Sequence, residues 1–106
     1  MAEGMAYAGG LTRVVLDDTV NTISYPAADG GLRDPDILAV VCEGQSVRYV
    51  VTDATLDQDP TADFGMPITA GSPAQIPYVS GQEIRFLRMA EGAIIQYQWF
   101  RKTRAA

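Results

Sequence analysis

The chain has 106 residues, 47% of them hydrophobic and 20% charged, which is enough for one globular domain with one core. Its formal net charge of −5 disfavours a general nucleic-acid binder, because neutralising phosphates requires a basic surface. The absence of His and the single Cys exclude Ser-His-Asp and Cys-His catalysis, a His/Cys zinc centre and an internal disulfide.

The first ten residues are small, contain several glycines and show no hydrophobic period, so residues 1–10 are predicted to form an extended N-terminal arm. Glu3 stands where a signal peptide would be basic, and no apolar run follows. No stretch approaches the roughly 20 apolar residues needed to span a bilayer. We therefore expect a protein that is made in a cytoplasm and not exported by the standard route.

Two strands are predicted in the first third of the chain. Residues 11–16 are rich in β-branched side chains and end at Asp17-Asp18. Residues 19–25 alternate imperfectly between apolar and polar side chains, which is also typical of a strand. Residues 26–36 contain Asp, Gly and Pro turn signals and are predicted to form a loop.

The clearest hairpin is predicted over residues 37–52. Residues 37–43 form a continuous apolar run, which favours a central strand covered on both faces. Residues 43–46 form a tight turn, and residues 47–52 alternate as a second strand. Cys42 lies within the apolar run without a cationic neighbour, so it is interpreted as a buried core residue.

The second half of the chain contains four further predicted strands, at residues 66–69, 74–79, 83–89 and 93–100. Pro77 places the second of these at a sheet edge, because it lacks a backbone N–H. Residues 90–92 are predicted to join the last two strands as a second hairpin. Residues 101–106 are predicted to form a basic C-terminal tail.

These elements predict an all-β fold. Seven or eight short strands with regularly spaced turns and no helical period favour a single antiparallel β-sandwich, of the jelly-roll or Ig-like type. The predicted organisation is an arm at residues 1–10, the sandwich domain at residues 11–100 and the basic tail at residues 101–106.

An acidic loop is predicted over residues 53–65, with four aspartates at Asp53, Asp57, Asp59 and Asp63. Loop oxygens are the ligands that Ca²⁺ prefers, but the spacing is not that of an EF-hand. We favour a solvated loop in which Asp side chains stabilise turns. A carboxylate-based hydrolase acting through this loop is the alternative enzyme hypothesis. We expect no catalytic residue, cofactor or metal site.

Two groups of side chains invite opposite interpretations. Arg48, Arg85 and Arg88 lie in predicted strands, where they either pair with carboxylates of the same chain or contact a neighbouring subunit. Tyr97, Trp99 and Phe100 are interpreted as core and strand-pairing residues. The alternative is an exposed aromatic platform in a carbohydrate-binding or receptor-binding module.

Residues 48–100 combine strand, turn and aromatic motifs in a characteristic order. The motifs read Arg48-Tyr49, Asp59-Pro60-Thr61-Ala62, Gly65-Met66-Pro67-Ile68, Thr69-Ala70-Gly71, Glu83-Ile84-Arg85-Phe86 and Tyr97-Gln98-Trp99-Phe100-Arg101. In this order they resemble small all-β virion structural proteins of tailed bacteriophages. The resemblance covers about half of the chain and no part of residues 1–47.

The resemblance implies a capsid decoration, or cement, protein that stabilises the head by bridging subunits, with a collar or tail accessory as the alternative. It implies a location in the virion, assembled in the host cytoplasm, and partners that are the major capsid protein or other virion proteins. It also implies a homo-oligomer, with a trimer favoured, and no nucleic-acid or membrane partner. The expected interface residues are Met1, Met5, Tyr7, Arg48, Arg85, Arg88, Arg101, Lys102 and Arg104.

Overall fold

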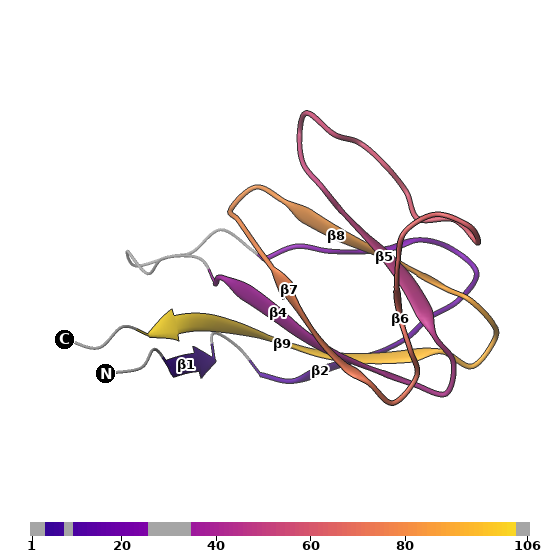
Figure 1. Cartoon of the computed structure of the whole chain (residues 1–106), viewed down its shortest axis with the longest axis horizontal. Coiled ribbons are helices and arrows are strands. Elements are labelled where there is room, and N and C mark those ends of the chain that lie inside the picture. Colours follow the sequence, from indigo (N-terminus) through magenta and orange to yellow (C-terminus); the bar gives the residue numbers. More distant parts are fainter. Residues whose placement is uncertain (1–3, 8–9, 26–34, 104–106) are drawn as a thin grey trace.

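The computed structural model describes residues 4–7, 10–25 and 35–103, and over these ranges the protein is all-β, with nine strands and no helix (Figure 1). The all-β prediction is therefore confirmed. The strands are β1 (Gly4–Tyr7), β2 (Thr12–Val15), β3 (Asn21–Ile23), β4 (Ile37–Glu43), β5 (Val47–Thr52), β6 (Met66–Ile68), β7 (Pro73–Pro77), β8 (Glu83–Arg88) and β9 (Ile94–Thr103). No helix long and apolar enough to cross a membrane occurs in these ranges.

The strands form two antiparallel sheets. In the five-stranded sheet, called sheet 1, β9 lies between β4 on one side and β1 and β2 on the other, and β7 lies outside β4. The four-stranded sheet, called sheet 2, has the order β3-β8-β5-β6. β7 is an outer strand of sheet 1, as Pro77 predicts.

Both predicted hairpins are wrong. β4 pairs with β7 and β9, whereas β5 pairs with β6 and β8, so β4 and β5 lie in different sheets. β8 and β9 are likewise separated. In both places the chain reverses at the predicted turn but crosses to the other sheet. Because of this crossing, consecutive strands lie in opposite sheets and their apolar sides face each other across one core. In a flat hairpin both strands would lie in the same sheet.

The two sheet-crossing turns pack against each other. The backbone N–H of Met89 donates to the carbonyl oxygen of Ser46 at 3.0 Å. Gly44 has a φ of 77°, and a Cβ placed on it would lie 2.2 Å from the carbonyl oxygen of Gly92. The first turn therefore needs glycine both for its backbone conformation and for its approach to the second turn.

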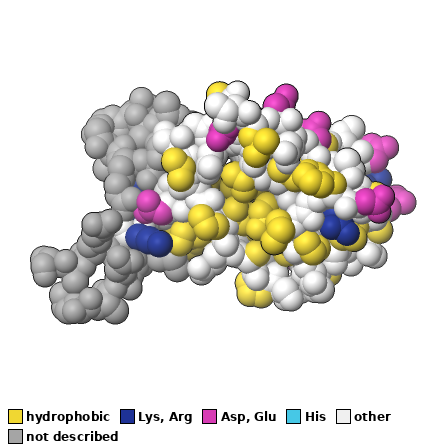
Figure 2. Space-filling view, turned by 45° about the horizontal axis from the view of Figure 1, so that its top comes forward, with side chains coloured by type: hydrophobic (Ala, Val, Ile, Leu, Met, Phe, Trp, Pro, Cys, Tyr) yellow, Lys and Arg dark blue, Asp and Glu magenta, His cyan; other side chains and the backbone are white. Residues whose placement is uncertain are grey.

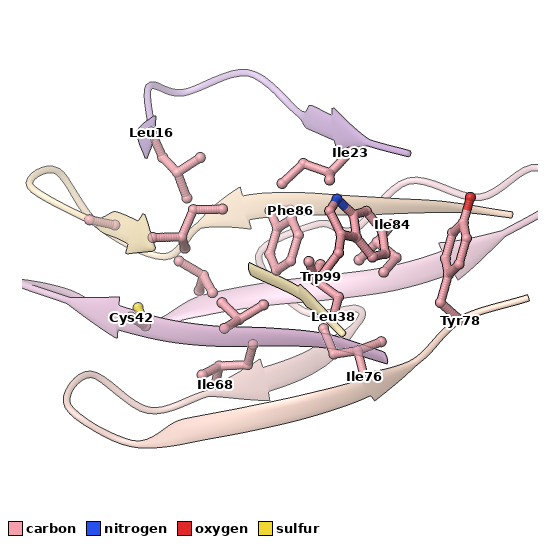
Figure 3. Packing of buried hydrophobic residues seen from close by; sticks show 14 residues of the cluster. Leu16, Ile23, Leu38, Cys42, Ile68, Ile76, Tyr78, Ile84, Phe86 and Trp99 are labelled. Carbon is pink, nitrogen blue, oxygen red and sulfur yellow. The ribbon is translucent and has the colours of Figure 1, made fainter. Parts of the chain in front are cut away.

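One core takes side chains from both sheets (Figure 3). Leu38, Val40 and Cys42 of β4 are almost fully buried, as are Ile84 and Phe86 of β8. The prediction of a buried core Cys42 is confirmed, and burial raises the pKa of its thiol. However, Val41 on the other side of β4 is 39% exposed, so this strand is not covered on both faces.

The only Trp of the sequence, Trp99, lies in the core, as predicted. It is 7% exposed and makes edge-to-face contacts with Tyr78 and Tyr25, at ring-centre distances of 4.7 Å and 5.5 Å. Tyr97 packs against the same cluster. Trp99 therefore does not offer the exposed platform on which a sugar-binding surface would depend.

The structure differs from the expected arm and tail where it describes them. Gly4–Tyr7 pairs with residues 100–103 of β9, so this part of the predicted arm is a strand in the chain's own sheet. Residues 101–103 of the predicted tail continue β9. The sequence contained no signal for this pairing, because it depends on a partner strand about 95 residues further along the chain. The remaining arm and tail residues lie outside the described ranges.

Candidate functional site

The acidic loop between β5 and β6 is held to sheet 2 by Arg85. Its Nη1 donates to Asp57 Oδ1 at 2.7 Å, to Asp59 Oδ1 at 2.9 Å and to the carbonyl oxygen of Gln58 at 2.9 Å. Its Nη2 donates to Glu83 Oε1 at 3.1 Å. These carboxylates raise the pKa of Arg85 above its ordinary value. The guanidinium predicted for an interface thus organises a loop of its own chain.

Arg48 holds the other end of the same loop. Its Nε donates to the carbonyl oxygen of Ala62 at 3.0 Å, and its Nη1 donates to the carbonyl oxygen of Gly65 at 2.9 Å. The register places Arg48 on the side of sheet 2 opposite to Tyr49, which packs on the core. Arg48 and Arg85 therefore both point outward and fasten residues 57–65 across the outer face of sheet 2.

The fastened loop buries part of that outer face. Val50 and Thr52 alternate with the core-facing Tyr49 and Val51, yet they are only 9% and 2% exposed. Pro60 of the loop is buried as well. The loop therefore covers the middle of the outer face of sheet 2, while Phe64 of the loop and Met66 of β6 remain exposed beside it.

Asp53 shapes the start of this loop. Its Oδ1 accepts hydrogen bonds from the backbone N–H groups of Thr55 at 2.8 Å and Leu56 at 2.9 Å, and from Thr55 Oγ1 at 2.7 Å. These bonds lower the pKa of Asp53. Asp side chains thus stabilise turns, as the sequence suggested. Over the described residues, no group of three or more Cys, Asp or Glu side chains is placed to hold a metal ion.

The other predicted interface residues do not contact the acidic loop in the way that Arg48 and Arg85 do. Arg88 is half-buried and its Nη1 approaches the carbonyl oxygen of Leu16 at 3.5 Å. Arg101 Nη2 donates to the hydroxyl of Tyr25 at 3.4 Å, and the backbone N–H of Lys102 donates to Asp36 Oδ2 at 2.8 Å. For Met5 and Tyr7 the structure describes the backbone of β1. Met1 and Arg104 lie outside the described residues.

The outer face of sheet 1 has a different character. Ala39 and Val41 of β4 and Gln96, Gln98 and Phe100 of β9 share it, as the pairing register and the burial of the alternating residues show. Among the outward positions of β2, β4 and β7, and of β9 up to Phe100, two carry a charge: Arg13, which lies opposite Gln96, and Glu43, which accepts a hydrogen bond from Gln96 Nε2. This face is therefore apolar and amide-rich.

A shallow groove of about 370 Å³ lies on this outer face. Its lining includes Leu11, Val41, Pro73, Gln98 and Phe100. Polar amides of Gln75, Gln96 and Gln98 also line it, whereas Figure 2 turns forward the side of the β5–β6 loop, where Asp and Glu side chains lie toward the periphery. Exposed apolar surface bordered by polar residues is typical of a protein contact surface.

The sequence interpretation missed this face because its residues are spread over β4, β7, β9 and the segment that leads into β2. Leu11 is 64% exposed and Val15 63%, although both were predicted only as strand residues. One signal was present: β4 and β9 carry apolar or amide side chains at successive positions where a solvated face would carry charges. The pairing of the strands was needed to see that these positions share one surface.

Comparisons with known proteins yield no relative: no family model, no curated protein and no solved structure matches the chain.

Proposed function

We propose that this chain is a structural protein of a tailed-phage virion, which decorates the capsid and stabilises the head by bridging subunits. The observation that carries the proposal is the centre of the outer face of sheet 1, where β4, β7 and β9 present apolar and amide side chains, with Arg13 and Glu43 as the charged residues beside them. Depletion of charged residues is characteristic of the centre of protein–protein interfaces. The outer face of sheet 2, in contrast, is partly covered by the chain's own loop, which carries the acidic residues.

The strand order supports a finer fold assignment, and we propose a jelly roll rather than an Ig-like sandwich. Between β2 and β9 the chain changes sheet at every connection except the one between β5 and β6. The resulting orders are β2-β9-β4-β7 and β3-β8-β5-β6. This alternation is typical of a jelly roll, an architecture found in viral capsid domains. An Ig-like sandwich would keep three pairs of consecutive strands in one sheet, A with B, D with E and F with G, whereas between β2 and β9 only β5 and β6 stay together.

A decoration protein works by binding. Any ligand that binds the assembled particle and not the disrupted one stabilises the particle by mass action. A stiff sheet face is suited to this role, because little conformational entropy is lost when a preorganised surface docks. The partners would be the major capsid protein or other virion proteins, and the chain would act as a homo-oligomer in the virion.

The test uses heads of the phage that carries this gene, prepared from a strain in which the gene is deleted. Purified chain should bind these heads saturably, in hundreds of copies per particle, and should raise the temperature at which the heads release DNA. A few to a dozen copies would instead indicate a neck or tail component. Failure to bind any virion assembly would refute the proposal.

A pair of variants locates the binding face. Val41→Glu places a charge on the outer face of sheet 1 and should weaken binding to the heads. Val79→Glu adds the same charge at an exposed valine outside the nine strands and should bind like the wild type. Equal binding by both variants would show that the outer face of sheet 1 is not the docking surface.

A further inference from the structure

The outer strands of the two sheets differ in their ability to pair with a further strand. β7 has Pro73 and Pro77 at its two ends, and β6 has Pro67 at its centre. β3 has three residues. Proline and short length are the usual means by which proteins prevent pairing at sheet edges. Three of the outer strands are therefore protected against pairing.

β2 is also short, with four residues, but it lacks the prolines of β6 and β7. It contains no Pro or Gly, and within the described residues its single strand partner is β9. Arg13 is its one charged residue, and Val15 at its end is 63% exposed. An open edge that carries an exposed β-branched residue is a template for pairing with another strand.

The backbone groups of this edge point in a defined direction. The N–H of Leu16 donates to the carbonyl oxygen of Ala93 at 3.0 Å, so Leu16 directs its backbone groups toward β9. In an antiparallel ladder these directions alternate from residue to residue. The N–H and C=O of Val15 and Arg13 therefore point to the open edge.

We propose that β2 pairs antiparallel with β2 of a second copy of this chain, about a two-fold axis through Val15. In this register the two Val15 residues face each other as a hydrogen-bonded pair, and Arg13 of each copy lies opposite Asp17 of the other. A two-fold axis guarantees that every such contact occurs twice. Sheet 1 then continues across the axis into sheet 1 of the second copy.

Charge complementarity favours this register and favours a second copy of the chain as the partner of β2. An axis through Arg13 would place the two guanidinium groups opposite each other, and an axis through Val14 would place Arg13 opposite an uncharged valine. Only the axis through Val15 pairs Arg13 with a carboxylate, because Asp17 follows at the required spacing. Asp17 is exposed, and hydrogen bonds from Thr19 to its Oδ1 lower its pKa, so it is ionised at neutral pH.

The inference goes beyond the proposed function, because it identifies a self-contact that depends on no virion partner. It also differs from the trimer that the family resemblance favours, since a single two-fold contact forms a dimer. The contact involves one short strand from each copy, so we expect a dimer that dissociates on dilution.

Sedimentation of the full chain, from micromolar to millimolar concentration, provides the test. The wild type should pass from monomer to dimer. Val15→Pro removes an N–H that β9 does not use, so it should remain monomeric with an unchanged melting temperature. Val15→Lys should also remain monomeric, whereas Val79→Lys, at a valine of nearly equal exposure (64%), should dimerise like the wild type.

A charge exchange tests the register. Arg13→Asp should raise the dissociation constant of the dimer at least about tenfold, because it places two carboxylates opposite each other. The double variant Arg13→Asp, Asp17→Arg should restore dimerisation. A monomer at every concentration, or an oligomer that is insensitive to Val15→Pro and Val15→Lys, would overturn the inference. Binding of phage heads by the monomeric Val15→Lys variant would leave the proposed function standing.

Discussion

Replacing Gly44 by Ala tests the packing of the two sheet-crossing turns. The φ of 77° at Gly44 lies in the left-handed region, where an L-residue costs about 1–2 kcal/mol. The added Cβ would lie 2.2 Å from the carbonyl oxygen of Gly92, so backbone must move, at a further cost of about 1–3 kcal/mol. The sum is about 2–5 kcal/mol, a large part of the roughly 5–15 kcal/mol that stabilises a domain of this size.

Gly81→Ala is the matched control. Gly81 has a φ of 90°, and a Cβ placed on it would meet no atom within 4 Å, so this substitution carries the backbone cost without the clash. Denaturant unfolding monitored by the fluorescence of Trp99, which is buried in the folded state, measures both variants. Gly44→Ala should lose about 1–3 kcal/mol more than Gly81→Ala. Equal losses would refute the close contact between the turns.

Three further predictions concern the loop and the core. Asp53 has a lowered pKa in the folded state. The stability that its ionised carboxylate contributes is therefore fully present above pH 3.8, its ordinary pKa, and is lost as the pH falls through the lowered pKa of the folded state. Asp53→Ala should therefore lower the urea midpoint at neutral pH, with a difference from the wild type that shrinks in acid; a constant difference would contradict this assignment. Arg85→Gln removes the cation that binds Asp57 and Asp59, so limited proteolysis within residues 53–65 should become faster, while an unchanged cleavage rate would show that Arg85 does not fasten the loop. Cys42 is fully buried and its thiol pKa is raised, so Ellman's reagent should react at the rate of unfolding, and rapid labelling of the folded protein would contradict its burial.

For the acidic loop, the sequence predicted what the Asp side chains do but not which residues hold the loop in place. The sequence indicated that Asp side chains stabilise turns, and Asp53 does so with three hydrogen bonds. It left two interpretations of Arg48 and Arg85 open. Both guanidinium groups bind the loop of their own chain, a result that depends on contacts up to 28 residues apart. Sequence spacing does not specify such contacts.

The sequence by itself indicated the strands from β2 to β9, the turns between most of them and much of the core, including Cys42 and Trp99, but neither β1 nor the exposure of Val41. These properties follow from alternation of side chains, from Gly and Pro, and from the apolar character of β4, β8 and β9, all of which act over a few residues. The absence of His and the single Cys likewise restricted the chemistry without any structure.

Only the tertiary structure decided how the strands pair. The turns at residues 44–46 and 89–93 have the sequences of reversals, but a reversal is compatible both with a hairpin and with a crossing to the opposite sheet. The chain crosses in both places, so that consecutive strands face each other across one shared core. The same pairing creates the apolar, amide-rich outer face of sheet 1 and the open edge of β2, and these surfaces carry the functional proposals.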